Sequence, residues 1–364
     1  LDFMWVVAGP AGSRYLADYG ATHIKVESST RPDTARTLQP YLNGQPGPER
    51  SGLFSNVNAG KLGLTLNLAV PQGRELALRL AAWADVIVES YTPKAMKSWG
   101  LDYDAVRALN PGVIMLSSCL AGQYGPWAGL AGFGTMGAQL AGFGELAGWP
   151  DRPPAGPFGA YTDYVAPKFT ALAIVAALDH RRRTGEGQHI DLSQAECSLH
   201  FIAPAFLDYF ANGRVMTRAG NSSPHYAPHA VFPAAGQDRW VAIVTESEEQ
   251  WAGLCQALGD AELAAESRFA TMAARLANRE DLEMRIAAWT AVREQGDIED
   301  MLQAHGVPAY RVARSEDVAA DPQLSHRGHW VTVPHAELGD VTIESARSIL
   351  SETPARYLRA GPTY

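Results

Sequence analysis

The sequence predicts an α/β protein of two domains, and three observations lead to this class. Candidate strands alternate with candidate helices over residues 1–210, a pattern typical of a mostly parallel sheet covered by helices. A polar segment at 211–228 then precedes a shorter region of mixed strands and helices. The length of 364 residues exceeds the size at which one hydrophobic core usually stops growing, which favours two domains.

The large first domain is expected to have a Rossmann-like sheet, because each apolar strand candidate leads into a helix candidate. It opens with a strand at Leu1–Val7, a turn of small residues at Ala8–Gly12 and a helix at Ser13–Tyr19. The later elements continue this alternation, with strands at His23–Glu27, Leu64–Leu68, Asp85–Glu89, Val113–Ser118 and His189–Leu192, and helices at Gln72–Ala84, Asp102–Leu109 and Gln194–Phe210. Ligands of such sheets bind at the carboxyl ends of the strands.

The loops that follow these strands are rich in small and polar residues. AGP follows the first strand, SYTPK follows DVIVE, and SSCLAGQYGP follows VIMLSS, so backbone N–H groups are able to approach a ligand closely. The segment Gly129–Gly148 contains too much glycine for a long stable helix. The connection at 28–60 is long enough to cover an active site or contact a partner.

One acid, Asp163, stands among small and aromatic residues just before an apolar helical segment, Phe169–Leu178. Pro167 is expected in the first turn of this helix, because further along it would remove a backbone hydrogen bond. Position alone leaves two interpretations of Asp163 open. It is either a helix cap or a carboxylate nucleophile that faces a cleft at the edge of the sheet.

The second domain is expected to be a smaller α+β unit at residues 229–329. Strands are predicted at His229–Pro233, Arg239–Thr245 and Val307–Val312, and helices at Glu248–Leu258 and Ala274–Val292. From about residue 330 the chain becomes strand-like again, and we expect residues 330–364 to complete the first domain. Leu1 already falls within a predicted strand, so the natural N-terminus is expected upstream.

Composition excludes several classes of protein. The net charge of −9 argues against a general nucleic-acid-binding protein, which needs a basic excess. The three cysteines are too few and too scattered for a disulfide framework or a zinc site, so we expect them to be buried and the compartment to be reducing. No apolar run is long enough for a membrane helix, and no leader pattern opens the chain, which together favour the cytoplasm.

The first strand, helix and second strand also invite a dinucleotide-binding interpretation. A glycine-bearing turn is followed by an acid, Glu27, at a strand end. The turn reads AGPAG and lacks the GxGxxG spacing that brings a pyrophosphate close to the backbone, so NAD binding is disfavoured.

Five blocks of the sequence, in order and spanning most of the chain, resemble the class III CoA-transferases, the group that includes formyl-CoA transferase and carnitine CoA-transferase (CaiB/BaiF type). They read AGPAGSRYLADYGATHIKVES, NAGKLGLTLNLAVPQGRE, ADVIVESYTPKAMKSWGLDYDAVRALNPGVIMLSSCLAGQYGP, TGEGQHIDLS and, in the small domain and its exit, VPAYRV with DPQLSHRGHW. Each block alone is weak evidence, whereas five in register are highly specific.

The resemblance implies covalent catalysis by Asp163, because the family's invariant carboxylate falls in the segment GAYTDYVAP. This carboxylate would attack an acyl-CoA thioester, giving a mixed anhydride and then an aspartyl-CoA thioester. The resemblance also implies CoA contacts by the loop Val6, Val7 and Ala8 and by Ser90 and Tyr91, and Lys61 matches a basic position of the family and is expected to contribute to CoA binding. Lys94 and Lys97 are nearby cations that either meet the CoA phosphates or belong to a solvated helix face. Coenzyme A is a substrate here, and neither a permanent cofactor nor a metal is expected.

Departures from the family pattern bear on the reaction and its substrate. The formyl-CoA branch has an acid where this chain has Gly134, which makes oxalate and formate poor candidates. The racemase branch has a His-Asp pair where this chain reads GFGTMG, and proton exchange next to a thioester needs two acid-base groups. Aromatic residues ahead of Asp163 favour an apolar acyl group; these are Trp127, Phe133, Phe143 and Trp149.

Three functions therefore remain open at the level of the sequence. The leading one is CoA transfer from an acyl-CoA to a free carboxylic acid. The first alternative is a 2-methylacyl-CoA racemase or acyl-CoA lyase of the same fold, and the second is a non-catalytic CoA-binding subunit. The resemblance also implies an interlocked homodimer, for which the long connections at 28–60 and 211–228 leave room.

Overall fold

The computed structural model describes residues 1–364, which form two compact units. The first unit contains Leu1–Ala147, Pro154–Met216 and Pro322–Tyr364, and the second contains Gly148–Pro153 and Thr217–Asp321. Each unit has its own hydrophobic core. None of the helices combines the length and apolar character that crossing a membrane requires.

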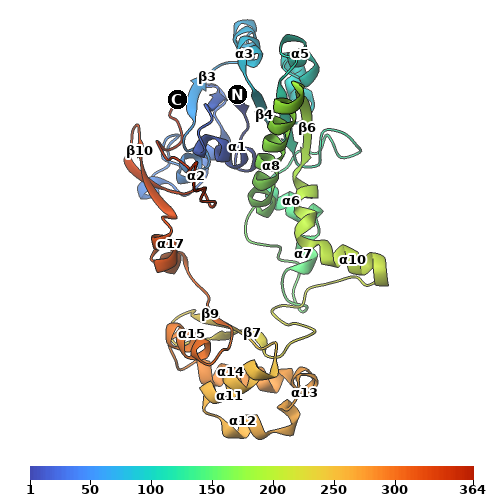
Figure 1. Cartoon of the computed structure of the whole chain (residues 1–364), viewed down its shortest axis with the longest axis vertical. Coiled ribbons are helices and arrows are strands. Elements are labelled where there is room, and N and C mark those ends of the chain that lie inside the picture. The colour runs from blue at the N-terminus through green and yellow to red at the C-terminus, as the bar shows by residue number, and fades with distance from the viewer. The chain divides into compact units, whose positions relative to one another are not determined.

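Six parallel strands form the sheet of the first unit, in the spatial order β3-β2-β1-β4-β5-β6. Figure 1 labels β3, β4 and β6 of this sheet. The strands are β1 (Asp2–Phe3), β2 (Ile24–Glu27), β3 (Leu62–Thr65), β4 (Val86–Glu89), β5 (Ile114–Cys119) and β6 (Gln188–Ser193). This order confirms the predicted Rossmann-like α/β fold. The strand sequence reverses between β1 and β4, and a parallel sheet has its ligand crevice at the carboxyl end of such a reversal.

Helices cover both faces of this sheet, so that β5 is buried along its whole length. On one face Leu116 packs with Ile174 of α8, and on the other Met115 packs with Val106 of α5. The helices of this unit are α1 (Ala8–Asp18), α2 (Gly52–Val57), α3 (Pro71–Trp83), α4 (Lys94–Trp99), α5 (Tyr103–Leu109), α6 (Gly134–Leu140), α7 (Phe143–Leu146), α8 (Tyr161–Thr184), α9 (Gln194–Leu199), α10 (Ala203–Asn212) and α17 (Pro322–His326).

The predicted helix after Asp163 is α8, and it starts earlier than expected. It begins at Tyr161, which places Pro167 in the helix interior and corrects its predicted first-turn position. Pro167 has no N–H to donate to the carbonyl group four residues earlier, which is that of Asp163. The C-terminal end is as predicted, with Arg181–Arg183 in the last turn and Gly185 at φ 80°.

Several other predicted boundaries were wrong; the strand predicted at Leu64–Leu68, for example, is β3 at Leu62–Thr65. The strand at Leu1–Val7 is shorter, because β1 ends at Phe3 and Val6 adopts a left-handed conformation with φ 67°. The small residues expected to form a turn at Ala8–Gly12 instead form the first turns of α1, where Pro10 needs no intrahelical donor. The helix expected at Gln194–Phe210 is divided into α9 and α10 by a 3₁₀ turn at His200–Ile202.

The long connection at 28–60 consists of irregular chain around three short elements. Two are 3₁₀ turns, η1 (Thr34–Thr37) and η2 (Leu42–Gly44), and the third is α2. At the end of the chain an antiparallel hairpin of β10 (Trp330–His335) and β11 (Gly339–Glu344) packs next to α2, with Val333 and Ile343 buried against Ala59.

The second unit combines a three-stranded antiparallel sheet with helices. The strands, in the order β7-β8-β9, are β7 (His229–Pro233), β8 (Trp240–Val244) and β9 (Ala309–Arg311). The helices are α11 (Glu248–Leu258), α12 (Ala261–Ala265), α13 (Met272–Ala277), α14 (Arg279–Thr290), α15 (Gln295–Ala304) and α16 (Ser315–Ala319). The long helix predicted at Ala274–Val292 is interrupted at Asn278, which ends α13 and precedes α14.

Candidate active site

A cavity of about 500 Å³ lies at the carboxyl ends of β1 and β4 in the first unit. Six of the nine residues predicted as site residues line it together: Val6, Val7, Ala8, Ser90, Tyr91 and Asp163. The remaining walls come from η1, the start of α6 and the start of α9; these residues include Thr34, Gly132, Phe133, Met136 and Gln194. The switch point of the sheet thus brings one carboxylate together with loops of small residues.

Asp163 lies in the first turn of α8 and is 7% exposed. The helix cap is Ala160, which makes no side-chain cap, so Asp163 does not serve as the predicted alternative cap. Burial raises the pKa of the Asp163 carboxyl to about 6, and a hydrogen bond from the backbone N–H of Gly134 opposes this rise. The carboxylate is therefore poorly hydrated yet ionised at neutral pH.

Gly134, the first residue of α6, is pressed against Asp163. A Cβ atom at position 134 would lie 2.6 Å from both Cγ and Oδ1 of Asp163. The adjacent Thr162 donates a hydrogen bond from Oγ1 to the carbonyl oxygen of Gly134 at 3.2 Å. Any side chain at position 134 would therefore displace the Asp163 carboxylate. Glycine, which this chain has in place of the acid of the formyl-CoA branch, leaves the space that the carboxylate occupies.

The loop between β1 and α1 is held by three side chains that come from different segments. Lys25 donates to the carbonyl oxygen of Met4 at 2.6 Å, and Ser90 Oγ accepts from the N–H of Trp5 at 2.9 Å. Asp33 Oδ1 accepts from the N–H of Val6 at 2.9 Å. These contacts hold Val6 in its left-handed conformation, which costs a β-branched residue about 1–3 kcal/mol.

Asp33 and Lys25 were missed as site-supporting residues by the sequence analysis. They form an ion pair at 2.9 Å with both side chains fully buried, so removal of either partner would leave an uncompensated buried charge. A signal was present in the sequence, since a lysine within a predicted buried strand must find a carboxylate partner. The identity of that partner depends on the path of the 28–60 connection, which the sequence does not specify.

The three predicted lysines lie outside this cavity. Lys61 is fully buried, where it pairs with Asp2 at 2.9 Å and also bonds Ser13 and Asn58. The expectation that Lys61 meets CoA is corrected for this reason, because a ligand cannot reach its ammonium group. Lys94 and Lys97 are exposed on α4, the helix that follows Ser90 and Tyr91.

A neighbouring cavity of about 620 Å³ shares Trp5 and Tyr91 with the first. The two rings meet edge to face, with centroids 5.8 Å apart. Ala95 and Trp99 of α4 line this second space, as does Arg31, which the sequence analysis did not single out. The two cavities together run along the carboxyl edge of the sheet from β2 to Asp163.

The structure contains no candidate metal site, and its cysteines are not reactive groups. No group of three or more His, Cys, Asp or Glu side chains is arranged to hold a metal ion. All three cysteines are free and buried, as predicted, and burial raises the pKa of each thiol to about 11. They are therefore poor nucleophiles at neutral pH.

The fold and the cavity define an α/β protein with a cavity at the switch point of a parallel sheet and a buried carboxylate in the wall of that cavity. The sequence profile of CoA-transferase family III matches residues 1–364. The chain therefore belongs to CoA-transferase family III, and it is an enzyme that transfers CoA.

Two named CoA-transferases and one solved structure are similar to this chain over nearly its full length. The chain is 33% identical to the succinyl-CoA–D-citramalate CoA-transferase of Chloroflexus aurantiacus, over 98% of this chain and 87% of that protein. It is 34% identical to the succinate–glutarate CoA-transferase of Agrobacterium fabrum, over 100% of this chain and 90% of that protein. A CaiB/BaiF family protein from Brucella suis superposes with a TM-score of 0.91 at 33% identity, covering 100% of this chain and 94% of that one.

Proposed function

We propose that the protein moves CoA from an acyl-CoA to a free carboxylic acid through covalent intermediates on Asp163. The observation that carries the proposal is that Asp163 is the one carboxylate lining the cavity at the switch point, and it does not cap its own helix, α8. Its raised pKa, about 6, reflects weak solvation, which leaves an ionised carboxylate more reactive toward a thioester.

The proposed chemistry proceeds through two kinds of intermediate. The Asp163 carboxylate attacks the thioester carbonyl carbon, the C–S bond breaks, and CoA thiolate leaves a mixed anhydride behind. The thiolate then attacks the Asp163 acyl carbon, which releases the donor acid and forms an aspartyl-CoA thioester. The acceptor carboxylate repeats the sequence in reverse, so acceptor-CoA leaves and Asp163 is regenerated. No proton transfer to carbon is needed.

The composition of the cavity disfavours the racemase alternative. Inversion next to a thioester requires two acid-base groups, one on each side of the reacting carbon. The cavity wall contains Asp163 but no histidine and no second carboxylate. CoA transfer by contrast needs one nucleophile in a site that excludes water from the anhydride.

CoA itself is proposed to lie along the carboxyl edge of the sheet. The Val6–Ala8 loop, Ser90 and Tyr91 would contact the pantetheine arm in the first cavity, and the neighbouring cavity would take the nucleotide. Lys94 and Lys97 extend from α4, which lines that cavity with Ala95 and Trp99, and we propose that these lysines meet phosphate oxygens of CoA.

The names of the relatives favour dicarboxylic acids as substrates over the apolar acyl groups expected from the sequence. Succinyl-CoA, succinate, glutarate and D-citramalate in those names all denote chains with a second carboxyl group. Of the four aromatic residues behind the apolar expectation, only Phe133 lines the cavity. We therefore propose a short dicarboxylate as acyl donor and acceptor.

Assembly as a homodimer is also part of the proposal. Helix α10 has no buried residue. Exposed apolar side chains on this helix include Leu207, Tyr209 and Phe210, at 65%, 54% and 81% exposure. An apolar surface of this kind usually marks an interface.

Replacement of Asp163 by Asn tests the proposed mechanism. The amide is isosteric but not nucleophilic, so transfer of CoA from succinyl-CoA to glutarate should fall by at least about a thousandfold. Asp104→Asn, which removes an exposed carboxylate from α5, is the matched control and should retain full activity. Product formation is followed by chromatography, and substantial turnover by Asp163→Asn would reject Asp163 as the nucleophile.

A further inference from the structure

Glu89 is a buried acid at the switch point of the sheet that takes no part in the proposed chemistry. It is the last residue of β4 and is 2% exposed. In the sheet it lies between Phe3 of β1 and Ser117 of β5. The next two residues, Ser90 and Tyr91, line the cavity at the switch point. Glu89 therefore lies directly beneath the wall of that cavity.

The Glu89 carboxyl has no positively charged partner. The Ser117 side chain hydrogen-bonds it, and the N–H of Tyr91 donates to its Oε2 atom at 2.7 Å. Burial raises the pKa of the Glu89 carboxyl to about 7, and the negative charge of Asp191 adds to this rise. A buried acid without a cation costs stability, and such costs are concentrated at functional sites.

A chain of hydrogen bonds and ring contacts fixes the orientation of this carboxyl. Ser117 Oγ lies 2.9 Å from Nε2 of His189 on β6. The His189 ring stacks on Tyr103 of α5, with ring centroids 5.2 Å apart. Burial lowers the pKa of His189, so at neutral pH its ring is an uncharged hydrogen-bond partner. Side chains of three adjacent strands therefore hold the Glu89 carboxyl in place.

The turn that follows Glu89 belongs to both cavities along the carboxyl edge of the sheet. Glu89 holds the N–H of Tyr91, and Ser90 Oγ accepts from the N–H of Trp5 at 2.9 Å. Tyr91 and Trp5 line both the cavity that holds Asp163 and the neighbouring cavity. The Tyr91 ring also meets Trp99 edge to face, with centroids 5.2 Å apart. A displacement of this turn would therefore move the wall that the two cavities share.

We propose that Glu89 is a positioning residue for CoA. By accepting a hydrogen bond from the N–H of Tyr91, it fixes the wall between the two cavities that would hold the pantetheine arm and the nucleotide. Glu89 itself lines neither cavity, so it acts through Tyr91 rather than by touching CoA. The proposal rests on the proposed placement of CoA along the carboxyl edge of the sheet.

Replacement of Glu89 by methionine tests this role, because methionine has a similar length and only a weak acceptor. The turn then rearranges, since leaving the Tyr91 N–H without a partner costs free energy. We expect the Kd of CoA in titration calorimetry and the KM for succinyl-CoA both to rise about tenfold, with kcat within about twofold. Glu89→Gln retains an oxygen acceptor and should restore the Kd to within about threefold of the unaltered enzyme.

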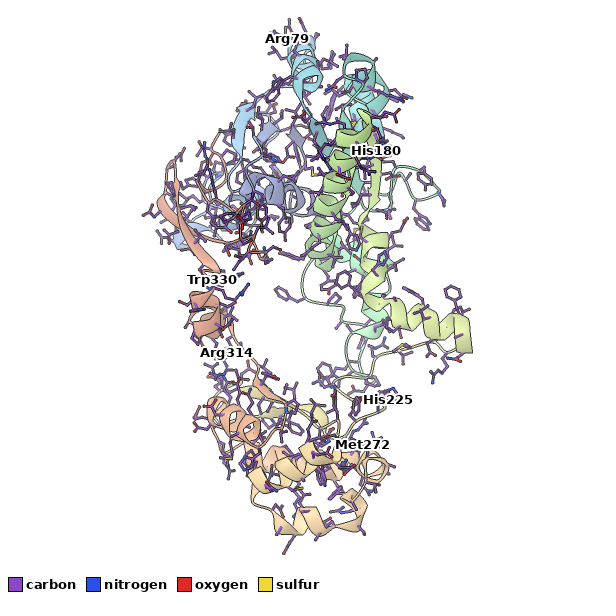
Figure 2. All side chains as sticks on the ribbon, viewed as in Figure 1. Arg79, His180, His225, Met272, Arg314 and Trp330 are labelled. Carbon is purple, nitrogen blue, oxygen red and sulfur yellow. The ribbon has the colours of Figure 1, made fainter.

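An effect of charge alone would have the opposite sign. CoA is a polyanion and Glu89→Met removes a negative charge, so electrostatics alone would tighten binding. The control for long-range charge effects is Arg79→Gln, which removes a positive charge from the exposed part of α3 (Figure 2) and should leave the Kd unchanged. An unchanged or tighter Kd in Glu89→Met would overturn the proposal.

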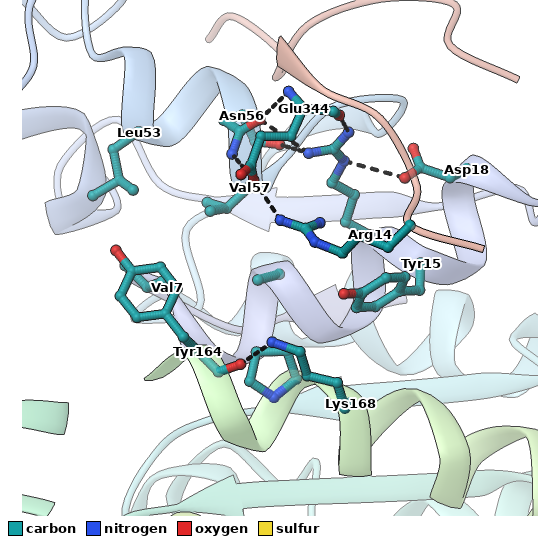
Figure 3. A pocket seen from close by; sticks show the side chains of 13 residues that line it. Val7, Arg14, Tyr15, Asp18, Leu53, Asn56, Val57, Tyr164, Lys168 and Glu344 are labelled. Atoms are coloured by element: carbon teal, nitrogen blue, oxygen red, sulfur yellow. Dashed lines mark hydrogen bonds and ion pairs between the residues drawn. The ribbon is translucent and has the colours of Figure 1, made fainter. Parts of the chain in front are cut away.

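A purely structural role for Glu89 also predicts a different result. It would lower the fraction of folded enzyme, and hence the apparent kcat, without changing the Kd. Asp18→Leu is the matched control, because Asp18 is also a buried acid, and burial raises the pKa of its carboxyl to about 6. Asp18 lies at the opposite end of α1 from the Val6–Ala8 loop and pairs with Arg14 at 3.3 Å (Figure 3). This variant should lose stability and bind CoA normally, and equal rises of the Kd in both variants would contradict the proposal.

A milder variant gives the answer if Glu89→Met does not fold. Ser117→Ala removes only the hydroxyl group that bonds the Glu89 carboxyl, and it should raise the Kd of CoA about threefold. An unchanged Kd in a folded Ser117→Ala enzyme would overturn the proposal. Failure of the proposed mechanism looks different, because Asp163→Asn would then remain active while the effect of Glu89→Met on the Kd of CoA stayed the same.

Discussion

At the scale of single residues, the environment of Asp163 favours reactivity at the expense of stability. Folding moves the pKa of this carboxyl from 3.8 to about 6. A raised carboxyl pKa means that the folded state binds a proton more readily than the unfolded chain does. The protonated Asp163 carboxyl therefore contributes to the stability of the folded state. This contribution is complete below pH 3.8 and is lost as the pH rises through 6. At neutral pH the buried charge therefore destabilises the fold.

This difference predicts that Asp163→Asn is more stable than the unaltered enzyme at pH 7.5. A shift of about two pKa units corresponds to roughly 3 kcal/mol in the free energy of unfolding. The gain should shrink as the pH falls and disappear below pH 3.8, where the carboxyl is protonated in both the folded and the unfolded state. Denaturant unfolding at several pH values measures it, and a loss of stability at pH 7.5 would argue against this account of the carboxyl.

The sequence identified Asp163 by its motif but did not predict its surroundings. A family motif specifies which residue matches the invariant carboxylate, and the structure places that residue in the predicted cleft. Lys61 shows what a motif does not predict. A basic residue that matches a family position in the sequence is not thereby known to be exposed or buried. The burial of Lys61 depends on Asp2 and Ser13, which are distant along the chain.

At the scale of elements, the start of α6 and the first turn of α8 meet without a side chain between them. Gly134→Ala inserts a methyl group 2.6 Å from the Asp163 carboxylate. We expect kcat to fall at least about tenfold, because a displacement of 1 Å can cost a hundredfold in rate. Gly129→Ala is the matched control, since a Cβ there meets nothing within 4 Å.

The outcome is measured as CoA transfer, with circular dichroism to show that both glycine variants are folded. Equal activity in Gly134→Ala and Gly129→Ala would show that the contact with Asp163 is not needed for catalysis. The sequence alone indicated Gly134 as a departure from the family pattern. It did not reveal that the missing side chain leaves the space that Asp163 occupies.

Alternation of apolar strands and helices was enough to predict the parallel sheet, because both faces of such a sheet must be covered. Element boundaries near the site were less predictable. The strand expected at Leu1–Val7 ends at Phe3, since the buried Lys25–Asp33 pair holds Val6 in a conformation that its own side chain disfavours. Long-range contacts of this kind override local preference and leave no local sequence signal.

At the scale of the whole molecule, the exposed apolar side chains of α10 predict self-association. We expect a dimer that persists at micromolar concentration in light scattering, because such a surface is unfavourable in water. Phe210→Asp combined with Leu207→Asp should weaken the dimer, whereas Arg79→Gln should not. A monomer at micromolar concentration before any substitution would contradict the proposed assembly.

The central claim is that Asp163 carries the acyl group and then CoA, and trapping that intermediate tests it most directly. The enzyme is incubated with succinyl-CoA and then with borohydride or hydroxylamine, and its peptides are analysed by mass spectrometry. The account predicts a modified residue at Asp163 that is absent without succinyl-CoA and absent from Asp163→Asn. Modification of a peptide that lacks Asp163, in an enzyme that transfers CoA, would contradict it.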